Sequence, residues 1–217
     1  MHDKLSRRLG WMTRTQPLMI SRYRMMLGLY HDVFACSLAA FTEDWGQSWT
    51  FSEPIQDVYL GMVQPSFAKK LDGTLVAFMR DNGYPKQIRI AESKDQGITW
   101  SSVRTMDIPN PGSSVQCLVL RNGHWIVICN DTKKGRRRMT TSLSENEGAT
   151  WKWRRAVEDL GECGGEISYP TLIQAGDGSL HCTYSCKIPG KVSGYGRESI
   201  KHVHFDEGWI KAGEPLN

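Results

Sequence analysis

The sequence predicts an all-β fold built from repeated antiparallel sheets, and three observations support this prediction. An eight-residue segment that ends in Trp occurs three times, starting at residues 42, 93 and 144, so that consecutive copies are 51 residues apart. This interval is close to the roughly 40 to 50 residues of a four-stranded propeller blade. Asp-Gly and Asn-Gly pairs typical of hairpins recur at a similar interval, and no segment has a convincing helical period. We therefore expect a β-propeller of four-stranded antiparallel blades.

Each copy of the repeated segment is typical of a tight turn that leads into a strand. The third position holds Asp44, Asp95 or Asn146, whose short side chains can accept a hydrogen bond from the backbone of the turn. The fifth position is always Gly, which supplies the positive φ that such a turn needs. The closing Trp is large enough to fill the space between adjacent sheets. We expect these segments to be structural corners without chemistry of their own.

Hairpin signals and repeated turns together place the blades. Primed turns are expected at Asp72-Gly73, Asn122-Gly123 and Asp177-Gly178, each between two strands. The last repeat has no Trp-terminated turn, so its third and fourth strands are expected at 200–205 and 208–210. The chain is then a single domain, 1–217, with blades at about 11–60, 61–111, 112–165 and 166–210.

The repeated segment S/T-x-D/N-x-G-x-T/S-W resembles the Asp-box of the sialidase superfamily, whose members are β-propellers with BNR repeats. The resemblance covers about residues 10 to 210 and rests also on the segments 10–17, 64–66, 130–136 and 168–174. Because sialidase-like propellers normally have six blades, it implies that four are present and that the first blades are absent. We expect an N-terminally truncated propeller whose open edges favour self-association.

The resemblance also implies a glycosidase site with three carboxylate-binding arginines, a nucleophilic tyrosine, a glutamate that activates it and an aspartic acid as general acid/base. Arginine suits this task because its bidentate donors keep their charge, and sialidases are the tyrosine exception among glycosidases. Arg80 and Arg136 are similar in position to two of the arginines, although Arg137 and Arg138 compete with Arg136. Tyr169, in Ser168-Tyr169-Pro170, is similar in position to the nucleophilic tyrosine of the family. Arg14 is expected to line the same opening.

One residue departs from this pattern. Gln64 stands where the family has the activating glutamate, and an amide cannot accept the phenolic proton of a tyrosine, whose ordinary pKa is about 10. Glu166, three residues before Tyr169, is the alternative base, although a solvated loop position is the more common environment for such an acid. The general acid and the first arginine would lie in the absent blades, so we assign no general acid.

The predicted function is therefore that of a sialidase-like exo-glycosidase on acidic glycosides, either sialic-acid-type or uronate, whose activity in this chain depends on Gln64 and on the missing blades. A non-catalytic carbohydrate-binding propeller is the alternative that Gln64 favours. A polysaccharide lyase on the same fold is a further alternative. The expected partner is an acidic carbohydrate or glycoconjugate, and no cofactor is expected.

Composition excludes other classes of protein. The net charge of +4 is modest, and the basic run 133–138 lacks the interleaved aromatic residues of a nucleic-acid surface. No apolar run approaches the roughly 20 residues of a membrane span. The first residues lack the apolar core of a secretion signal, so we expect a cytoplasmic protein.

The remaining reactive side chains predict no further site. The chain has six cysteines, which are expected to be reduced and mostly buried, with a Cys182–Cys186 disulfide as a minor alternative. His202 and His204 share one face of a strand. A histidine pair without a third ligand is more often a cross-strand feature, so no metal site is expected. His31-Asp32 lacks an accompanying nucleophile and is expected in a loop.

Overall fold

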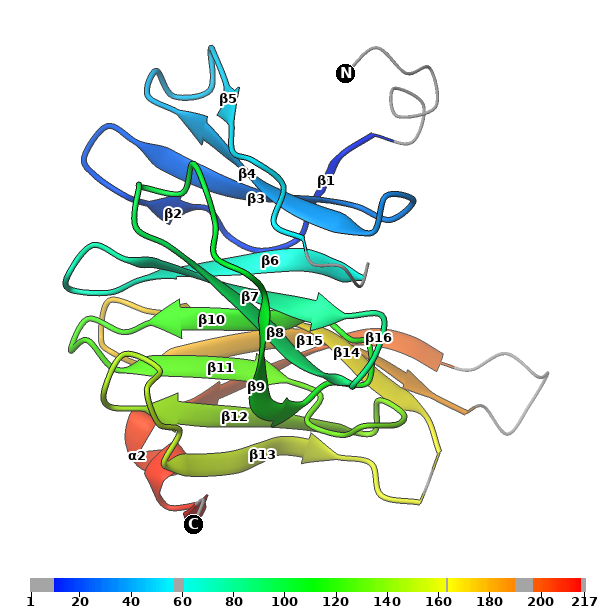
Figure 1. Ribbon diagram of the computed structural model, residues 1–217. Coiled ribbons are helices and arrows are strands. Elements are labelled where there is room, and N and C mark those ends of the chain that lie inside the picture. Colours follow the sequence, from blue (N-terminus) through cyan, green and yellow to red (C-terminus); the bar gives the residue numbers. More distant parts are fainter. Residues whose placement is uncertain (1–9, 57–60, 163, 190–196, 216–217) are drawn as a thin grey trace. The chain divides into compact units, whose positions relative to one another are not determined.

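The computed structural model describes residues 10–56, 61–162, 164–189 and 197–215. The chain forms two compact units, Met1–Asp107 and Ile108–Asn217, and each contains two antiparallel sheets (Figure 1). The prediction of an all-β fold with four antiparallel sheets is confirmed. None of the helices among the described residues is long and apolar enough to cross a membrane.

The first unit holds two sheets that follow the chain order closely. In the first sheet the order is β1-β3-β4-β5, with β2 paired to β3, and in the second it is β6-β7-β8-β9. The strands are β1 (Met12–Thr13), β2 (Leu18–Met19), β3 (Met25–His31), β4 (Cys36–Thr42), β5 (Thr50–Phe51), β6 (Met62–Lys69), β7 (Leu75–Asp81), β8 (Gln87–Ser93) and β9 (Arg104–Pro109). The last of these strands ends just beyond the boundary of the unit.

The core of the first unit lies where β3 and β4 pack against β6. Burial alternates along β3, whereas β4 and β6 are buried along nearly their whole length. The core residues of these strands include Met26, Ala39, Phe41, Met62 and Phe67, and Met79 of β7 packs with them. Gly28 allows the close approach, because a Cβ at this position would lie 2.7 Å from the carbonyl oxygen of Pro65. The contact between the two sheets thus depends on the absence of a side chain at residue 28.

The second unit contains a five-stranded sheet in the order β10-β11-β12-β13-β17 and a three-stranded sheet, β14-β15-β16. The strands are β10 (Val115–Val119), β11 (Trp125–Cys129), β12 (Arg138–Ser144), β13 (Trp153–Asp159), β14 (Glu166–Gln174), β15 (Leu180–Ile188), β16 (Arg197–Phe205) and β17 (Glu214–Pro215). Their core combines residues of both sheets, among them Ile126, Ile128, Leu143, Ile167, Leu172, Cys182 and Tyr184.

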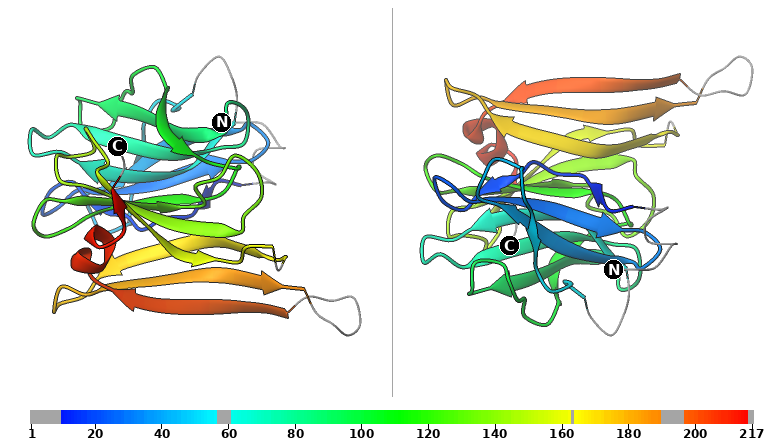
Figure 2. Two further views of the ribbon diagram at one scale, coloured as in Figure 1. Left: turned by 90° about the horizontal axis from the view of Figure 1, so that it is seen from below. Right: turned by 90° about the horizontal axis from the view of Figure 1, so that it is seen from above.

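The prediction of a fourth strand at 208–210 is wrong. This segment belongs to a helix, α2 (Glu207–Lys211), whose N-cap Asp206 accepts a hydrogen bond from the backbone N–H of Trp209 at 2.6 Å. The helix contacts β12 and β13 and buries Ile210 completely, and both views of Figure 2 show it beside these strands. Two adjacent hydrophobic residues, Trp209 and Ile210, in so short a segment do not distinguish a strand from one helical turn.

The three repeated turns have the same hydrogen bonds. In each, the first hydroxyl accepts the N–H of the Gly at 2.7–2.9 Å, and the Asp or Asn accepts the N–H of the residue before Trp at 2.9–3.0 Å. The residue before the Gly also has a positive φ, 59° at Trp45, 61° at Gln96 and 55° at Glu147, which the sequence did not indicate. The turns are corners of their sheets, and Gly97 packs closely against Phe41 of the neighbouring sheet.

Candidate functional site

The predicted site residues lie beside two β-bulges with the same backbone conformation. The register of β6 shifts between Val63 and Ser66, and that of β14 between Ser168 and Thr171. In each bulge the residue before a proline has a positive φ, 58° at Gln64 and 57° at Tyr169. Such a conformation is strained, because a residue before proline normally adopts an extended backbone. Strain of this kind costs about 1–3 kcal/mol and is often found at functional positions.

In the first unit, the bulge brings Gln64 to Arg80. Arg80 lies near the end of β7, opposite Val63, and its Nη1 donates to Oε1 of Gln64 at 3.4 Å. Gln64 is only 4% exposed. The Nε of Arg80 is buried without a hydrogen-bond partner among the described residues. The bulge of the first unit therefore pairs a buried amide with a half-buried guanidinium.

Arg14 is placed near the same bulge through its neighbour. It follows β1 directly, and the hydroxyl of Thr15 donates to the carbonyl oxygen of Pro65 at 2.7 Å. The structure thus gathers the Arg14 segment, Gln64 and Arg80 within the first unit.

In the second unit, the bulge opens onto a pocket of about 480 Å³. Three of the predicted site residues, Arg136, Glu166 and Tyr169, line it together. The other lining residues are Ser168, Ser185, Cys186, Lys187, Glu198, Ser199 and Ile200. The three residues were predicted separately from the sequence, and the fold brings them together at one cavity.

Arg136 faces the ring of Tyr169. Its guanidinium carbon lies 5.8 Å from the ring centroid, within cation–π range, and its Nη2 donates to the carbonyl oxygen of Gly112 at 2.9 Å. An arginine has five N–H donors, so this contact leaves several of them available. Tyr169 is 38% exposed.

Asn130 holds the Arg136 loop against β14. Its buried side-chain amide donates to the carbonyl oxygens of Ile167 (2.9 Å) and Arg138 (2.8 Å), and its oxygen accepts from Ser113 at 2.6 Å. The backbone carbonyl of Arg136 accepts the N–H of Ile167 at 2.7 Å. These bonds connect the loop to the strand that carries Tyr169. No pattern in the sequence indicates this role of Asn130, because its three partners lie on separate segments of the chain.

The competing arginines have other contacts. Arg138 lies beside the buried carboxylate of Asp131, 3.8 Å from Nε to Oδ1, and the same carboxylate forms an ion pair with Arg154. Arg137 is exposed and donates to the carbonyl oxygen of Gly161 at 3.4 Å. Of the three, Arg136 is the one that lines the pocket.

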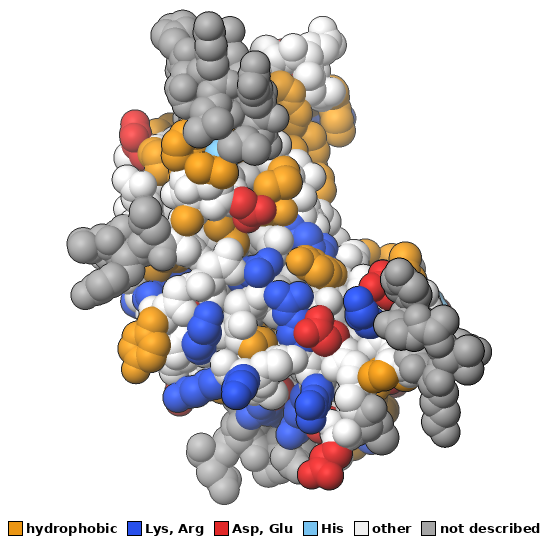
Figure 3. Space-filling view, turned by 90° about the vertical axis from the view of Figure 1, so that its right-hand side faces the viewer, with side chains coloured by type: hydrophobic (Ala, Val, Ile, Leu, Met, Phe, Trp, Pro, Cys, Tyr) orange, Lys and Arg blue, Asp and Glu red, His pale blue; other side chains and the backbone are white. Residues whose placement is uncertain are grey.

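The loop between β11 and β12 is strongly basic. Lys133, Lys134 and Arg137 are all exposed there. The loop projects from the right-hand end of its strands in Figure 1, and Figure 3, which is seen from that side, shows exposed Lys and Arg side chains with some Asp and Glu among them. A positive surface of this kind attracts anionic ligands.

Glu166 begins β14, so its expected placement in a loop is wrong. It is exposed and pairs in register with Lys187, whose ammonium lies 2.9 Å from Glu198. The pKa of Lys187 is raised by its hydrogen bond to Glu198 and then by the charge of that carboxylate, with a smaller contribution from Glu166. The pocket thus contains both acidic and basic groups.

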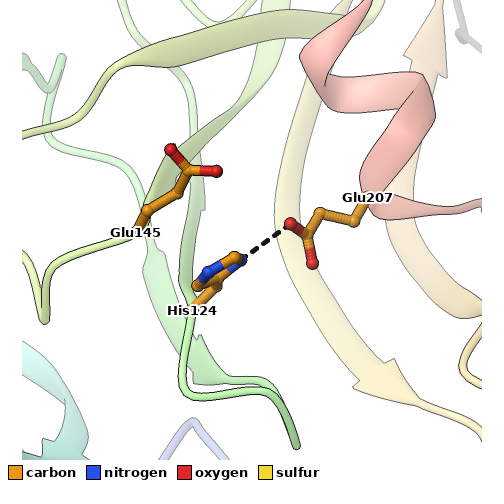
Figure 4. Close-up of side chains that lie close together, drawn as sticks. All are labelled: His124, Glu145 and Glu207. Carbon is orange, nitrogen blue, oxygen red and sulfur yellow. Dashed lines mark hydrogen bonds and ion pairs between the residues drawn. The ribbon is translucent and has the colours of Figure 1, made fainter.

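A separate group of ionisable side chains lies at α2. His124, Glu145 and Glu207 converge (Figure 4), with Nδ1 of His124 2.7 Å from Oε1 of Glu207. The ammonium of Lys211 lies 2.7 Å from both carboxylates. This cation compensates their charge and attaches the helix to the sheet.

His31 has a structural role. It ends β3 and is 1% exposed, so its expected loop position is wrong. Its Nδ1 accepts the N–H groups of Val33 and Phe34, both at 3.2 Å, and its ring packs between Trp11 and Phe34. These contacts stabilise the turn after β3.

The described cysteines are all buried and free, including Cys182 and Cys186, while Cys163 lies outside the described residues. Burial raises the pKa of Cys129 and of Cys182 to about 12. These thiols therefore remain protonated and unreactive at neutral pH.

Comparisons with known proteins agree with the fold. The chain resembles a structure of unknown function from Dyadobacter fermentans DSM 18053 (20% identity, TM-score 0.70, 89% of this chain and 53% of that one). It also resembles the NanB sialidase of Streptococcus pneumoniae (17% identity, TM-score 0.68, 90% of this chain and 31% of that one). A third similar structure is the GH93 α-L-arabinofuranosidase of Fusarium graminearum (15% identity, TM-score 0.65, 94% of this chain and 65% of that one). No curated protein matches.

These likenesses concern the fold, and they confirm the predicted sialidase-like β-propeller. The chain spans about half the length of the Dyadobacter protein and about a third of NanB. The family model described as a BNR repeat-like domain matches residues 8–182. The chain therefore belongs to the BNR repeat-like domain family.

Proposed function

We propose that this protein is a glycosidase-like propeller that binds acidic glycosides, of the sialic-acid or uronate type, in the pocket of its second unit. The observation that supports this proposal is the convergence of Arg136, Tyr169 and Glu166 on one cavity of about 480 Å³. A cation, a phenol and a carboxylate in one pocket provide a binding group for the sugar carboxylate, a nucleophile and a base, which are three of the groups that exo-hydrolysis of an acidic sugar needs.

Arg136 binds the sugar carboxylate in this proposal. Its guanidinium donates to one backbone carbonyl and lies over the Tyr169 ring, which orients the group. Its other N–H groups can donate to a carboxylate in bidentate geometry. The basic loop around it attracts an anionic substrate. The role of Arg80 in carboxylate binding, which the resemblance implies, stays a prediction.

Tyr169 then acts as the nucleophile and Glu166 as its base. Glu166 accepts the phenolic proton, the phenolate oxygen bonds to the anomeric carbon, and the bond to the leaving group breaks. The leaving oxygen needs a proton from a general acid, and water then releases the sugar from tyrosine. We assign no acid in the described residues to that step. The strained backbone at Tyr169, with φ of 57°, is consistent with a functional position.

The second candidate is a carbohydrate-binding propeller without turnover. It is favoured by Gln64, whose amide contacts Arg80 where the resemblance expects a carboxylate. Several similar structures are glycosidases, including NanB and the GH93 enzyme. Because this chain spans only part of each, their activities are not transferred to it.

Hydrolysis of a fluorogenic sialoside and of uronate glycosides, together with calorimetric titration of the free acidic sugars, tests both candidates. Arg136→Gln should weaken binding about tenfold or more, because a charge-assisted hydrogen bond contributes about 1.5–3 kcal/mol. Its exposed neighbour supplies the matched control, and Arg137→Gln should change binding less than about twofold. Arg80→Ala tests the prediction for the first unit in the same titration.

The outcomes separate the candidates. Turnover that Tyr169→Phe abolishes while binding persists supports the glycosidase, whereas binding without turnover supports the second candidate. An unsaturated product that absorbs in the ultraviolet identifies a lyase. Failure to bind any acidic glycoside contradicts the whole proposal. Self-association through open sheet edges stays a prediction, which sedimentation velocity on the full chain tests.

A further inference from the structure

Three histidines come together on the solvent-facing side of the three-stranded sheet. His202 and His204 lie on β16, and His181 lies on the neighbouring β15, directly opposite His204. Nδ1 of His181 is 3.0 Å from Nε2 of His202, with the rings stacked at 5.2 Å. The His181 and His204 rings are 4.9 Å apart. The third imidazole that the pair on β16 lacked in the sequence is thus supplied by the adjacent strand.

The hydrogen bonds of Ser179 determine which nitrogen of His181 carries a hydrogen. The hydroxyl of Ser179 donates to Oδ1 of Asp177 at 2.6 Å, and its oxygen lies 3.2 Å from Nε2 of His181. A serine hydroxyl has one hydrogen, so its oxygen must accept the hydrogen of Nε2. The hydrogen-bond network therefore places a hydrogen on Nε2 of His181, which leaves Nδ1, the nitrogen that faces His202, as the position for a metal ion.

The carboxylate at the end of this chain of bonds stays charged. The side-chain and backbone hydrogen bonds from Ser179 lower the pKa of Asp177. An imidazole that donates its second N–H toward a carboxylate, directly or through another group, is the arrangement that orients histidine ligands in metal sites. At His181 the serine relays this contact.

We propose that His181, His202 and His204 bind a divalent transition-metal ion of the Zn²⁺, Cu²⁺ or Ni²⁺ class. Neutral imidazoles suit these ions. An ion about 2.0–2.1 Å from both facing nitrogens, which are 3.0 Å apart, would subtend roughly 90–100° between them, a normal ligand angle. His204 is the third ligand after a side-chain rotation.

The surroundings leave room for an ion and its waters. His202 and His204 are exposed and His181 is half-buried. Of the three, His204 also lines a cavity of about 680 Å³, to which Ser179 and Asp177 contribute as well. Further coordination positions can therefore be filled by water or by a ligand.

The group at α2 is the competing site in the same unit. His124, Glu145 and Glu207 also approach one another, but the ammonium of Lys211 already contacts both carboxylates. A metal ion would have to displace that cation. His124 therefore provides a matched control within the same chain.

Calorimetric titration of ZnCl₂ into the full chain, prepared without a histidine tag at about pH 7.5, tests the proposal. We expect one site, weakened about tenfold or more by His181→Ala or by His202→Ala, and weakened also by His204→Ala. Ser179→Ala should weaken zinc binding about tenfold, because the loss of a group that orients a metal ligand commonly costs that much affinity. His124→Ala should leave the affinity unchanged.

Two further readouts separate coordination from a simple histidine pair. Cu²⁺ should give an electron paramagnetic resonance spectrum with nitrogen hyperfine structure that His181→Ala and His202→Ala alter. Binding should weaken as the pH falls toward about 5, because metal ligation requires neutral imidazole. Absence of zinc binding, unchanged affinity in both variants, or loss of binding in His124→Ala alone would overturn the proposal. Because His202 and His204 are exposed, we expect their substitution to leave the fold unchanged. Circular dichroism of each variant verifies this.

Discussion

The two proline bulges of this protein share a backbone and differ in chemistry. Gln64 and Tyr169 both precede proline, both have φ close to 58°, and both stand at a register shift near the start of a sheet's first strand. Gln64 is 4% exposed and contacts an arginine through its amide. Tyr169 is 38% exposed and contacts an arginine through its ring.

This difference shows how one backbone feature of a repeated fold can present different side chains. The bulge is a local distortion that turns one side chain out of the regular alternation of the strand. The residue type at that position can therefore differ between two sheets while the backbone hydrogen bonds between the strands stay the same. The first unit uses the position for a buried amide, and the second uses it for an accessible phenol beside a carboxylate and a cation.

Gly28→Ala should have the largest effect, because it forces a methyl group against the bulge of the first unit. The new Cβ would lie 2.7 Å from the carbonyl oxygen and 3.0 Å from Cγ of Pro65. We expect the free energy of unfolding to fall by about 2–3 kcal/mol, as for an overpacked core. Urea denaturation measures it. Gly176→Ala is the control, since no heavy atom lies within 4 Å of its Cβ, and an equal loss in both variants would contradict the prediction.

Asn130→Ala should disturb the bulge of the second unit. It removes a buried amide that bonds to Ser113, Arg138 and Ile167. We expect a loss of about 1–2 kcal/mol, because buried partners are left unsatisfied. Asn82 is exposed, so Asn82→Ala serves as the control in the same denaturation experiment. If Asn130→Ala weakened neither stability nor ligand binding at Arg136, the loop would not depend on this residue.

Exchanging the two bulge residues tests the comparison directly. Gln64→Tyr puts a larger side chain into a buried position and should cost about 1 kcal/mol. Tyr169→Gln at the exposed position should change stability by less than about 0.5 kcal/mol, while it removes any turnover that depends on the phenol. Thermal and urea unfolding of both variants measure the asymmetry. Equal costs would show that the two positions are packed alike.

The acid response of the turns should differ between the units, with the smallest effect. Hydrogen bonds from the Ser48 side chain lower the pKa of Asp44 from 3.8 to about 2, and those from Thr99 lower that of Asp95 likewise. Because these folded-state pKa values are depressed, the stabilisation is present above about pH 4 and is lost as the pH falls toward 2. Asp44→Asn and Asp95→Asn should flatten the decline of stability over this range. Asn146, in the second unit, has no such charge, so Asn146→Asp should steepen it; no change in any of the three variants would contradict the prediction.

Local chemistry was predictable from the sequence at the turns. All the groups that close a turn lie within eight residues, so the identity of Asp44, Asp95 or Asn146 and of the following Gly indicates the hydrogen bonds in advance. The same holds for the hairpins, and the order of the strands follows from both. The bulges at Gln64 and Tyr169 were not predictable, because a positive φ before proline contradicts local preference.

Contacts between distant segments could not be predicted from the sequence either. The pairing of Arg138 with Asp131 and Arg154, which distinguishes it from Arg136, depends on how β12 and β13 lie together. The return of the C-terminal segment to β13 as β17 and the approach of His181 to His202 likewise depend on sheet register. Short segments with weak hydrophobic patterns, such as α2, take their conformation from the surface they pack on.

By itself, the sequence determined the repeat, the corners of the sheets and the residue types available to a site, because turn chemistry acts over a few neighbouring positions. The tertiary structure alone decided which arginine reaches the tyrosine, which bulge is open to ligands and which histidines meet. Those outcomes depend on the register between strands, and a shift of one residue would turn each of these side chains to the opposite face.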